Sequence, residues 1–291
     1  MAPAKAVLVT GATGFLGRAT VPALAKAGWE VTVGSRTAVQ PLTARGVHLD
    51  LAEPATLLAL ATQNRFDAIV HLGARVGWRG ETEAELFVPN VLATGCLAYL
   101  AGFWDARLIF ASAAIVHGVR QETIETDSPL CSDTAYAKSK WLGEQLLTTS
   151  GIKQCVLRIA GVFGAGGPSH LGLNRAINSA IKGELPVQIG SGNALRNYVY
   201  VQDVAQAIVF VLQEHLGGTH LLAGSEVLSV REMLQGVCDT FFQGRHPVIE
   251  EGPEAMSQVV KPSILLPITR KFHAALIDIR REIDSEAGIA R

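Results

Sequence analysis

Several features that define whole classes of protein are scarce in this sequence of 291 residues. Its four cysteines, Cys96, Cys131, Cys155 and Cys238, lie far apart and form no Cys-x-x-Cys pair. That spacing suggests neither a zinc cage nor a disulfide framework, so we expect reduced, buried thiols and no metal site. Twenty-five basic and 26 acidic residues leave a net charge of −1, and no overall positive field would gather nucleic acid.

Long apolar runs are also absent. A membrane span requires roughly 20 predominantly apolar residues, and the longest uninterrupted candidates are short stretches such as AIVFVL at 207–212. The first residues are too few and too weakly apolar for a signal peptide, and the apolar run after them passes straight into glycines. We therefore expect a cytoplasmic protein with no membrane partner.

Short β-branched runs alternate with longer helical stretches along the chain. The expected strands are Ala6–Thr10, Glu30–Gly34, Ala68–Leu72, Leu108–Ser112 and Gln154–Arg158. The expected helices are Phe15–Ala27, capped by Gly28, then Glu81–Leu100 and Thr134–Thr149. Strands joined through helices need crossover connections, which predicts an α/β fold with a doubly wound parallel sheet covered on both faces.

The alternation of strands and helices ends after residue 163. A glycine-rich loop begins at Gly164 and leads into a short helical patch over Leu171–Lys182. Neither this part nor the tail fits the strand-helix repeat. We predict a nucleotide-binding domain over 1–163, to which 199–224 return, and a smaller substrate-binding lobe over 164–198 and 225–291.

The stretch VLVTGATGFLG at 7–17 is a strand, a glycine turn and the start of a helix. In such a unit Gly11 permits the tight turn, Gly14 lets a phosphate approach the backbone, and Gly17 lets the helix pack closely on the sheet. The free N–H groups at the start of the helix then meet a pyrophosphate. This predicts a Rossmann-type dinucleotide site.

The Gly-x-x-Gly-x-x-Gly spacing resembles the extended, nucleotide-sugar-modifying branch of the short-chain dehydrogenase/reductase superfamily. Further motifs follow in the order of that family: DL at 50–51, HLGA at 71–74, NV at 90–91, YAKSK at 136–140 and RNYVYVQDVA at 196–205. The resemblance implies cofactor contacts from Thr13, Phe15, Leu16, Asp50, Leu51, Leu72, Gly73, Ala74, Asn90, Ala111 and Val162. Asp50 and Leu51 would flank the adenine. Asn90, which follows a helix-interrupting Pro89, would support the cofactor site, unless it makes a simple buried polar contact.

The end of the second strand indicates which nicotinamide cofactor is used. An acidic residue there usually binds the adenosine ribose hydroxyls and repels a 2′-phosphate. This sequence has Gly34-Ser35-Arg36 instead. Because Ser35 can donate to a phosphate and Arg36 can pair with it, we predict NADP(H), with NAD less favoured.

Tyr136 and Lys140 are four residues apart on an expected helix, so both project from one face. A free phenol has a pKa near 10, and a neighbouring ammonium would lower it toward the range useful for proton transfer. The resemblance implies that Tyr136 exchanges a proton with the substrate oxygen while Lys140 holds the nicotinamide ribose.

The family's third catalytic member, a Ser or Thr that binds the substrate oxygen, is displaced here. Counting back from Val116-His117-Gly118 places Ala113 where that hydroxyl normally stands, and Ser112 lies one residue earlier. On a strand, one residue separates opposite faces, so Ser112 substitutes only if the backbone turns there. Thr134 and Ser132 are the weaker alternatives, and His117 replaces the family's usual tyrosine.

At the substrate end, Arg196 matches the family's diphosphate-binding arginine, a role that suits a bidentate and permanently charged donor. His170 and Asn174 lie in the expected lobe, where they contact substrate or simply sit at the surface. Ser112, Ala113 and Tyr136 complete the expected substrate contacts. Gly161 stands where several relatives carry an asparagine.

These observations favour an NADPH-dependent oxidoreductase that reduces a keto group, on a 4-keto-6-deoxy nucleotide sugar. The alternatives are a nucleotide-sugar 4-epimerase, a small-molecule carbonyl reductase and a catalytically silent NADP-binding regulator, the last suggested by Ala113. Family members often dimerise through the helices that carry the equivalents of Asn90 and Tyr136, so we expect a homodimer.

Overall fold

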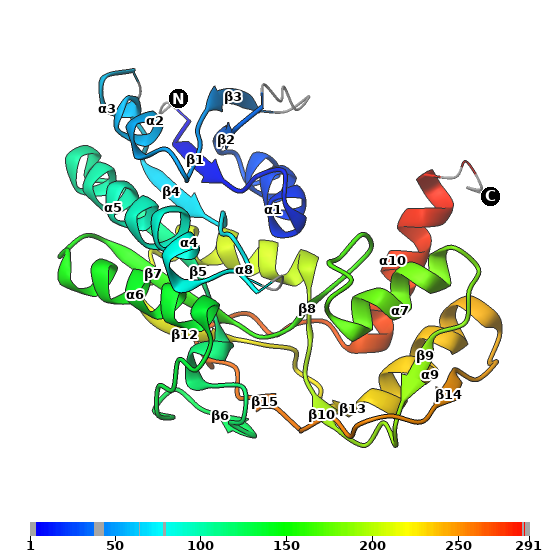
Figure 1. The fold of residues 1–291 in the computed structure, drawn as a ribbon. Coiled ribbons are helices and arrows are strands. Elements are labelled where there is room, and N and C mark those ends of the chain that lie inside the picture. Colours follow the sequence, from blue (N-terminus) through cyan, green and yellow to red (C-terminus); the bar gives the residue numbers. More distant parts are fainter. Residues whose placement is uncertain (1–3, 38–43, 64, 78–79, 287, 289–291) are drawn as a thin grey trace.

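The computed structural model describes residues 4–37, 44–63, 65–77, 80–286 and 288 (Figure 1). Seven parallel strands form its main sheet, in the order β3-β2-β1-β4-β5-β7-β12. Their bounds are β1 Ala6–Thr10, β2 Glu30–Ser35, β3 Arg45–His48, β4 Ala68–His71, β5 Arg107–Ala113, β7 Gln154–Ile159 and β12 Gly218–Leu222. The predicted Rossmann-type doubly wound sheet is confirmed. The sequence pattern missed β3 and β12, because the first is short and mostly exposed and the second has only one β-branched residue.

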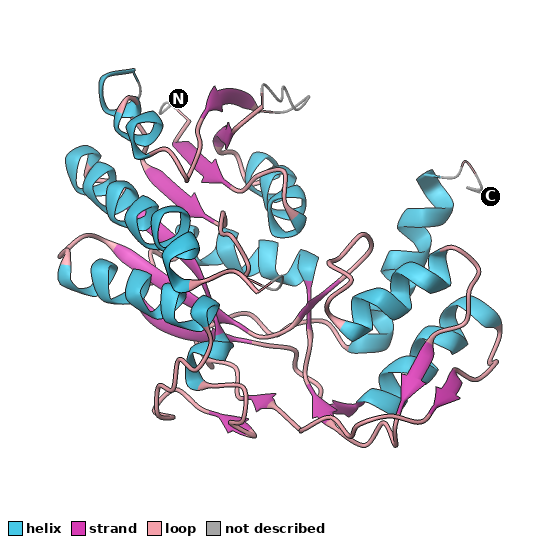
Figure 2. Ribbon diagram, viewed as in Figure 1, coloured by secondary structure: helices cyan, strands magenta, loops and turns pink. Residues whose placement is uncertain are grey.

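Helices cover both faces of this sheet (Figure 2). Their bounds are α1 Phe15–Lys26 and α8 Val201–Gln213 on one face, and α2 Pro54–Leu58, α5 Ala93–Trp104 and α6 Ala135–Thr149 on the other. Successive side chains of β1 point into the two cores in turn: Val7 and Val9 join the α1 and α8 core, whereas Leu8 joins the α5 and α6 core. All three are fully buried, which explains why the strand is an unbroken apolar run.

The expected helix over Glu81–Leu100 proves to be composite. It comprises α4 (Glu83–Leu86), a π-helical segment η1 (Phe87–Leu92) and α5, which extends to Trp104. Pro89 has no N–H and cannot continue an α-helical ladder, and the wider π turn takes it up without ending the helix. The α1 helix behaves as expected and ends one residue early, with Gly28 at φ +89° just beyond it.

The continuous helical stretch Glu83–Trp104 corrects one expectation. It is long and apolar enough to cross a membrane by length and composition, with a mean hydropathy of 1.6 in its most apolar window. However, 56% of that window is buried inside the fold, mainly against the sheet and α6. A core helix of a folded domain shows the same pattern, so this stretch is weak evidence for a span.

The remaining elements form a smaller lobe, at the right of Figure 1. Its helices are α7 (Gly172–Ile181), α9 (Val230–Phe242) and α10 (Phe272–Glu286), whose apolar faces meet in a core that also receives residues of α1 and α8. Short strand pairs complete it: β8 (Val162–Phe163) with β11 (Val199–Tyr200), β9 (Val187–Ile189) with β14 (Val248–Glu250), and β10 (Leu195–Arg196) with β13 (Leu228–Ser229). The domain bounds given above stay a prediction.

Four further short elements lie outside the main sheet. They are α3 (Leu60–Gln63), the 3-10 turn η2 (Ala114–His117) that follows β5, and the pair β6 (Thr123–Ile124) with β15 (Val259–Val260).

The four cysteines are free thiols. Cys131 is exposed and Cys96 half-buried, so the expectation of buried thiols holds only for Cys155 and Cys238. Among the described residues, no group of three or more His, Cys, Asp or Glu side chains could hold a metal ion.

Candidate active site

The glycine turn has the geometry of a phosphate cradle. Gly11 has φ +69°, a backbone conformation that other residues rarely adopt, and a Cβ there would lie 2.5 Å from the amide nitrogen of Gly73. A Cβ on Gly17 would overlap the carbonyl oxygen of Gly11, so the helix packs directly on the turn. Gly14 is the N-cap of α1 and makes no side-chain cap hydrogen bond. The first N–H groups of α1 are thus open to an anion, as a bound pyrophosphate requires.

Other predicted cofactor residues gather around this turn. Gly73 lies against Gly11, and Leu51 lies so close to Gly73 that a Cβ there would be 2.6 Å from Leu51 Cδ1. Phe15, at the start of α1, reaches the backbone of Gly164, and Val162 packs in the same cluster as Phe15 and Leu16. The carboxyl edges of β1 and β4 therefore form one continuous surface with the turn, and these residues fit a dinucleotide.

The end of β2 carries the two residues predicted to select NADP(H). The Ser35 side chain is buried and its Oγ accepts a hydrogen bond from the Thr37 N–H at 3.2 Å, while Arg36 is exposed. The exposed His48 on β3 is the register partner of Ser35, a neighbour that the sequence pattern did not reveal. Asp50 accepts from the Ala52 N–H and so shapes the following turn. Residues 38–43, which follow Arg36, lie outside the described residues.

Tyr136 and Lys140 lie on the first turns of α6, whose N-cap Thr134 accepts a hydrogen bond from the Ala137 N–H. Lys140 is buried, and its Nζ donates to the Ala111 carbonyl oxygen at 2.7 Å. The same Nζ lies 5.9 Å from the centre of the Tyr136 ring. The helix thus brings the predicted pair together, and the bond to Ala111 fixes it at the carboxyl end of β5.

Burial determines the acid-base state of this pair. Desolvation raises the pKa of Tyr136 to about 12. It also lowers the pKa of Lys140 to about 7, against the charge of Glu144, which acts to raise it. The lowering of the Tyr136 pKa expected from the sequence is therefore absent in the free chain. The effect of burial on the phenol outweighs the attraction of Lys140, which is itself only partly protonated. A bound oxidised nicotinamide would supply a hydride acceptor and a positive charge, and Tyr136 and Lys140 are the residues that would hold a proton beside it.

Ser112 does not take the place of the missing hydroxyl. Its Oγ donates to Glu144 Oε1 at 2.5 Å, between β5 and α6, and the side chain is buried. Ser132 Oγ donates to the Val116 carbonyl oxygen at 3.3 Å. The Thr134 Oγ accepts from a backbone N–H as the helix cap, which leaves its own hydrogen available. Thr134, the weaker alternative at the sequence level, is therefore the hydroxyl best able to donate near Tyr136.

The partner of Ser112 belongs to a buried charged network. Glu144 pairs with Arg158 on β7 at 2.7 Å, and Arg158 Nη1 lies 3.1 Å from His117 Nε2. His117 Nδ1 lies 3.1 Å from the carbonyl oxygens of Ser128 and Pro129, so it donates there while Nε2 accepts from Arg158. Desolvation lowers the pKa of His117, which favours this neutral form. The residue is a packed replacement for the family's tyrosine, as its position predicts.

Asn90 makes a buried polar contact, one of its two expected roles. Its Oδ1 accepts from the Arg75 N–H at 2.7 Å, and its Nδ2 donates to the Arg75 carbonyl oxygen at 2.8 Å and to Ser139 Oγ at 2.9 Å. Asn90 therefore holds the loop after β4 against α6.

The predicted substrate residues are spread more widely. Arg196 is partly exposed and donates from Nη1 to the Leu195 carbonyl oxygen. Asn174 is fully buried and bonds the Gly164 N–H and the Val162 carbonyl oxygen, so it shapes the loop over the glycine turn. That contact contradicts both expected roles, because a buried amide with both ends bonded to backbone is neither at the surface nor open to substrate. His170 is exposed and precedes α7.

Tyr198 is a site residue that the sequence pattern did not single out. A Cβ at Gly161 would overlap Tyr198 Cε1, and the Arg196 side chain lies close enough to act against the raised pKa of the phenol. Gly161 follows β7, the neighbour of β5, so the Tyr198 ring lies at the same edge of the sheet as Ala113. The glycine at 161 was the only sequence signal, because it departs from the asparagine of several relatives.

A glycine cradle, a paired tyrosine and lysine, and a parallel sheet that places them at one edge are typical of a dinucleotide-dependent enzyme. The chain belongs to the NAD-dependent epimerase/dehydratase family, whose model matches residues 7–224. It is an enzyme of the extended short-chain dehydrogenase/reductase type, and the family binds an NAD(P) cofactor.

Comparison with known proteins agrees with this assignment. The chain is 26% identical over 225 residues to a putative UDP-glucose 4-epimerase of Methanocaldococcus jannaschii, covering 71% of this chain and 73% of the relative. It is 32% identical over 225 residues to a dTDP-6-deoxy-L-talose 4-dehydrogenase (NAD(P)(+)) of Kitasatospora kifunensis, covering 72% and 70%.

Solved structures share the fold. A putative epimerase from Burkholderia cenocepacia has a TM-score of 0.85 at 20% identity, covering 97% of this chain and 99% of the other. The Bordetella bronchiseptica enzyme WbmH, in complex with NAD+, has a TM-score of 0.82 at 22% identity, covering 98% and 99%.

Proposed function

We propose that this chain is a nucleotide-sugar 4-epimerase. The observation that carries the proposal is the Tyr136 and Lys140 pair held at the carboxyl end of β5, beside the glycine cradle. The names of the curated relatives support C4 of a nucleotide sugar as the reacting carbon, and 4-epimerases are prominent among them. Epimerisation is thus better supported than the net keto reduction expected from the sequence.

In this proposal Tyr136 takes the proton of the 4-hydroxyl group as hydride leaves C4, and returns it when hydride comes back to the opposite face. Lys140, whose pKa burial lowers to about 7, holds the ribose and tunes the phenol. Arg196 binds the diphosphate, and Tyr198 orients its guanidinium. Since Ala113 has no hydroxyl, Thr134 donates to the sugar oxygen.

A second candidate, an NADPH-dependent 4-keto reductase, has one specific observation in its favour. No carboxylate stands at the end of β2, where Ser35, the exposed Arg36 and the neighbouring His48 present donors suited to a 2′-phosphate. The same observation supports NADP(H) as the cofactor of either activity. Replacing Arg36 with Asp should then raise the Kd for NADPH at least tenfold and leave that for NADH unchanged or lower. Tighter binding of NADH by the unaltered protein would contradict the cofactor assignment.

The test of the proposed function is a product analysis. Purified protein is incubated with UDP-glucose, UDP-N-acetylglucosamine and dTDP-sugars, with each dinucleotide, and the sugars are resolved by NMR. We expect interconversion of 4-epimers without net oxidation of the dinucleotide. Stoichiometric NADPH oxidation with a 4-keto sugar would instead establish the reductase.

The matched variant is Tyr136→Phe, which removes only the phenolic oxygen. We expect turnover to fall by about 10²–10⁴, the usual contribution of a positioned acid-base group, with dinucleotide binding and the melting temperature preserved. Undiminished turnover would exclude Tyr136 as the proton carrier.

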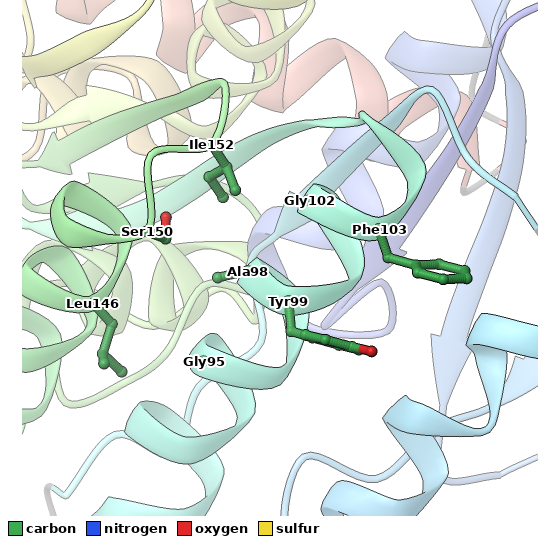
Figure 3. Close-up of a pocket in the computed structure, with 8 residues that line it drawn as sticks. All are labelled: Gly95, Ala98, Tyr99, Gly102, Phe103, Leu146, Ser150 and Ile152. Carbon is green, nitrogen blue, oxygen red and sulfur yellow. The ribbon is translucent and has the colours of Figure 1, made fainter.

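We also propose that the protein is a cytoplasmic homodimer, joined through the outer face of α5 and α6. A groove of about 510 Å³ runs along this face, far from the glycine turn, between the large exposed rings of Tyr99 and Phe103 on α5 and the side chains of Leu146 and Ile152 (Figure 3). Both residues are 62% exposed, which is unusual for large side chains on a helix face that no partner covers. A second copy of this chain would cover them.

A further inference from the structure

A buried row of hydrogen bonds joins the glycine turn to the catalytic helix. Thr10 Oγ1, at the end of β1, lies 3.3 Å from the Gly73 N–H and 2.7 Å from His71 Nδ1. His71 Nε2 lies 3.1 Å from Thr94 Oγ1, which donates to the Asn90 carbonyl oxygen at 2.6 Å. Thr10, His71 and Thr94 have no exposed surface.

Elementary donor counting fixes every proton in this row. The Asn90 carbonyl can only accept, so Thr94 uses its single hydrogen there. His71 Nε2 must then donate to Thr94, which leaves Nδ1 of the neutral ring as an acceptor. Thr10 therefore donates to Nδ1 and accepts from the Gly73 N–H. All partners are satisfied only when His71 is neutral and protonated on Nε2.

The surroundings of His71 maintain that state. Complete burial and the charge of Lys140 lower its pKa to about 3. The ring lies 5.4 Å from that of Phe110, which in turn lies 4.6 Å from Lys140 Nζ. The imidazole thus stays uncharged behind the catalytic lysine, and its tautomer is not altered by ordinary changes of pH.

The row continues beyond Asn90 into α6. The Asn90 side chain holds both the N–H and the carbonyl of Arg75 and donates to Ser139 Oγ, which donates to the Tyr136 carbonyl oxygen at 2.8 Å. The loop 73–75 is therefore bonded at one end to β1 through Thr10 and at the other to the helix that carries Tyr136.

We propose that His71 and Thr94 are positioning residues that fix the loop 73–75 between the glycine turn and the catalytic helix. They touch neither substrate nor reacting atoms. They set the separation between the dinucleotide cradle and Tyr136, so their loss weakens cofactor binding and misplaces the phenol. The inference rests on the proposed dinucleotide site for its effect on activity, but the loop's tethering is a property of the chain alone.

The experiment compares three variants with the unaltered protein. Thr94→Val keeps the shape and removes the hydroxyl, so the His71 Nε2–H loses its acceptor. Thr94→Ser keeps the hydroxyl and serves as the rescue. Thr240→Val is the matched control, because Thr240 on α9 makes the same bond to the carbonyl four residues earlier, in Gly236, far from the site.

Two readouts separate positioning from general stability. The first readout compares two constants, the Kd for NADPH and the KM for the sugar nucleotide. The second is the rate of hydrogen exchange in peptides covering 68–77 and 135–140. For Thr94→Val we expect a roughly tenfold higher Kd, as when a buried N–H is left unsatisfied, an unchanged KM for the sugar nucleotide, and faster exchange in both peptides. Thr94→Ser and Thr240→Val should match the unaltered protein in both readouts.

The inference is overturned if Thr94→Val changes only the melting temperature, or if Thr94→Ser is equally impaired. Failure of the proposed dinucleotide site gives a different pattern. In that case the unaltered protein binds neither NADPH nor NADH, while Thr94→Val still accelerates exchange in both peptides and so upholds the tether.

Discussion

One missing hydroxyl has consequences for several neighbouring side chains. Ala113 places a methyl group where the family's substrate-binding oxygen stands, and the nearest hydroxyl, that of Ser112, is committed to Glu144 on the opposite side of β5. The alternation of strand side chains explains this directly, because adjacent residues face opposite ways. In the proposed reaction the substrate oxygen is therefore left to Tyr136 and to Thr134, which caps the helix on which Tyr136 lies.

Gly161 provides a sharp test of the site's packing. Gly161→Ala should lower the free energy of unfolding by about 1–3 kcal/mol, because the new methyl group overlaps the Tyr198 ring. It should also raise the KM for the sugar nucleotide by displacing the ring that holds Arg196. Urea denaturation and steady-state kinetics measure the two effects. Gly172→Ala is the control, since no atom lies within 4 Å of a Cβ there, and equal effects of both substitutions would refute the packing argument.

Lys140 gives the stability of the free protein a particular pH dependence. Its pKa is about 7 in the folded chain and near 10.5 when unfolded, so between these values the unfolded chain binds the additional proton. Its contribution to the free energy of unfolding must therefore rise with pH through this window. Melting temperatures from pH 7 to 8.5 should climb more steeply for the unaltered protein than for Lys140→Met. Parallel curves would show that burial does not depress this pKa.

The helix α6, which carries Tyr136, is positioned by its N-terminal cap, by the Lys140 hydrogen bond and by one buried ion pair. Thr134 begins it, the Lys140 bond to Ala111 attaches its first turns to β5, and Glu144 attaches its middle to Arg158 on β7. Glu144 and Arg158 are both largely buried, so each charge depends on the other for solvation.

Removing one member of that pair should be costly. Arg158→Met leaves Glu144 as an unpaired buried carboxylate, and we expect the free energy of unfolding to fall by about 3–5 kcal/mol. Lys153→Met is the matched control, because it breaks the ion pair with Asp105 at an exposed site, where the loss should stay below about 1 kcal/mol. Chemical denaturation of both variants decides the matter, and similar losses would disprove a special role for burial.

In the part of the chain that the structure describes, the outer face of α5 has no partner. The same helical stretch that has the length and apolar composition of a membrane span, Glu83–Trp104, turns one side into the core and presents Tyr99 and Phe103 on the other. A second copy would bury those rings and explain the apolar composition without a bilayer.

The proposed dimer predicts a specific change in mass. Tyr99→Glu combined with Phe103→Glu should convert a dimer to a monomer in light scattering after size exclusion, since each charge would be buried without a partner. Ile249→Glu is the control, because Ile249 is equally prominent, at 71% exposed, but lies on β14 in the smaller lobe. A mass unaffected by the double variant, or a monomeric unaltered protein, would rule out this interface.

Local patterns were sufficient for much of the architecture. The β-branched runs predicted five strands of the parallel sheet. The glycine spacing predicted the cradle, because a side chain at position 11 or 17 would overlap neighbouring backbone atoms. The π-helical segment at Pro89 and the strand β12 were not predictable in this way. The first depends on packing that keeps a broken helix together, and the second owes its place to pairing with β7 rather than to its own composition.

The order of residues along the chain determined the fold class, the family, and the pairing of Tyr136 with Lys140, because each depends on spacing within one element or one turn. Only the tertiary structure decided which way Ser112 points, how burial shifts the pKa values of Tyr136 and Lys140, and which distant groups meet at His71. Those outcomes depend on side chains brought together from separate strands and helices, and on the water that they exclude, neither of which a local pattern contains.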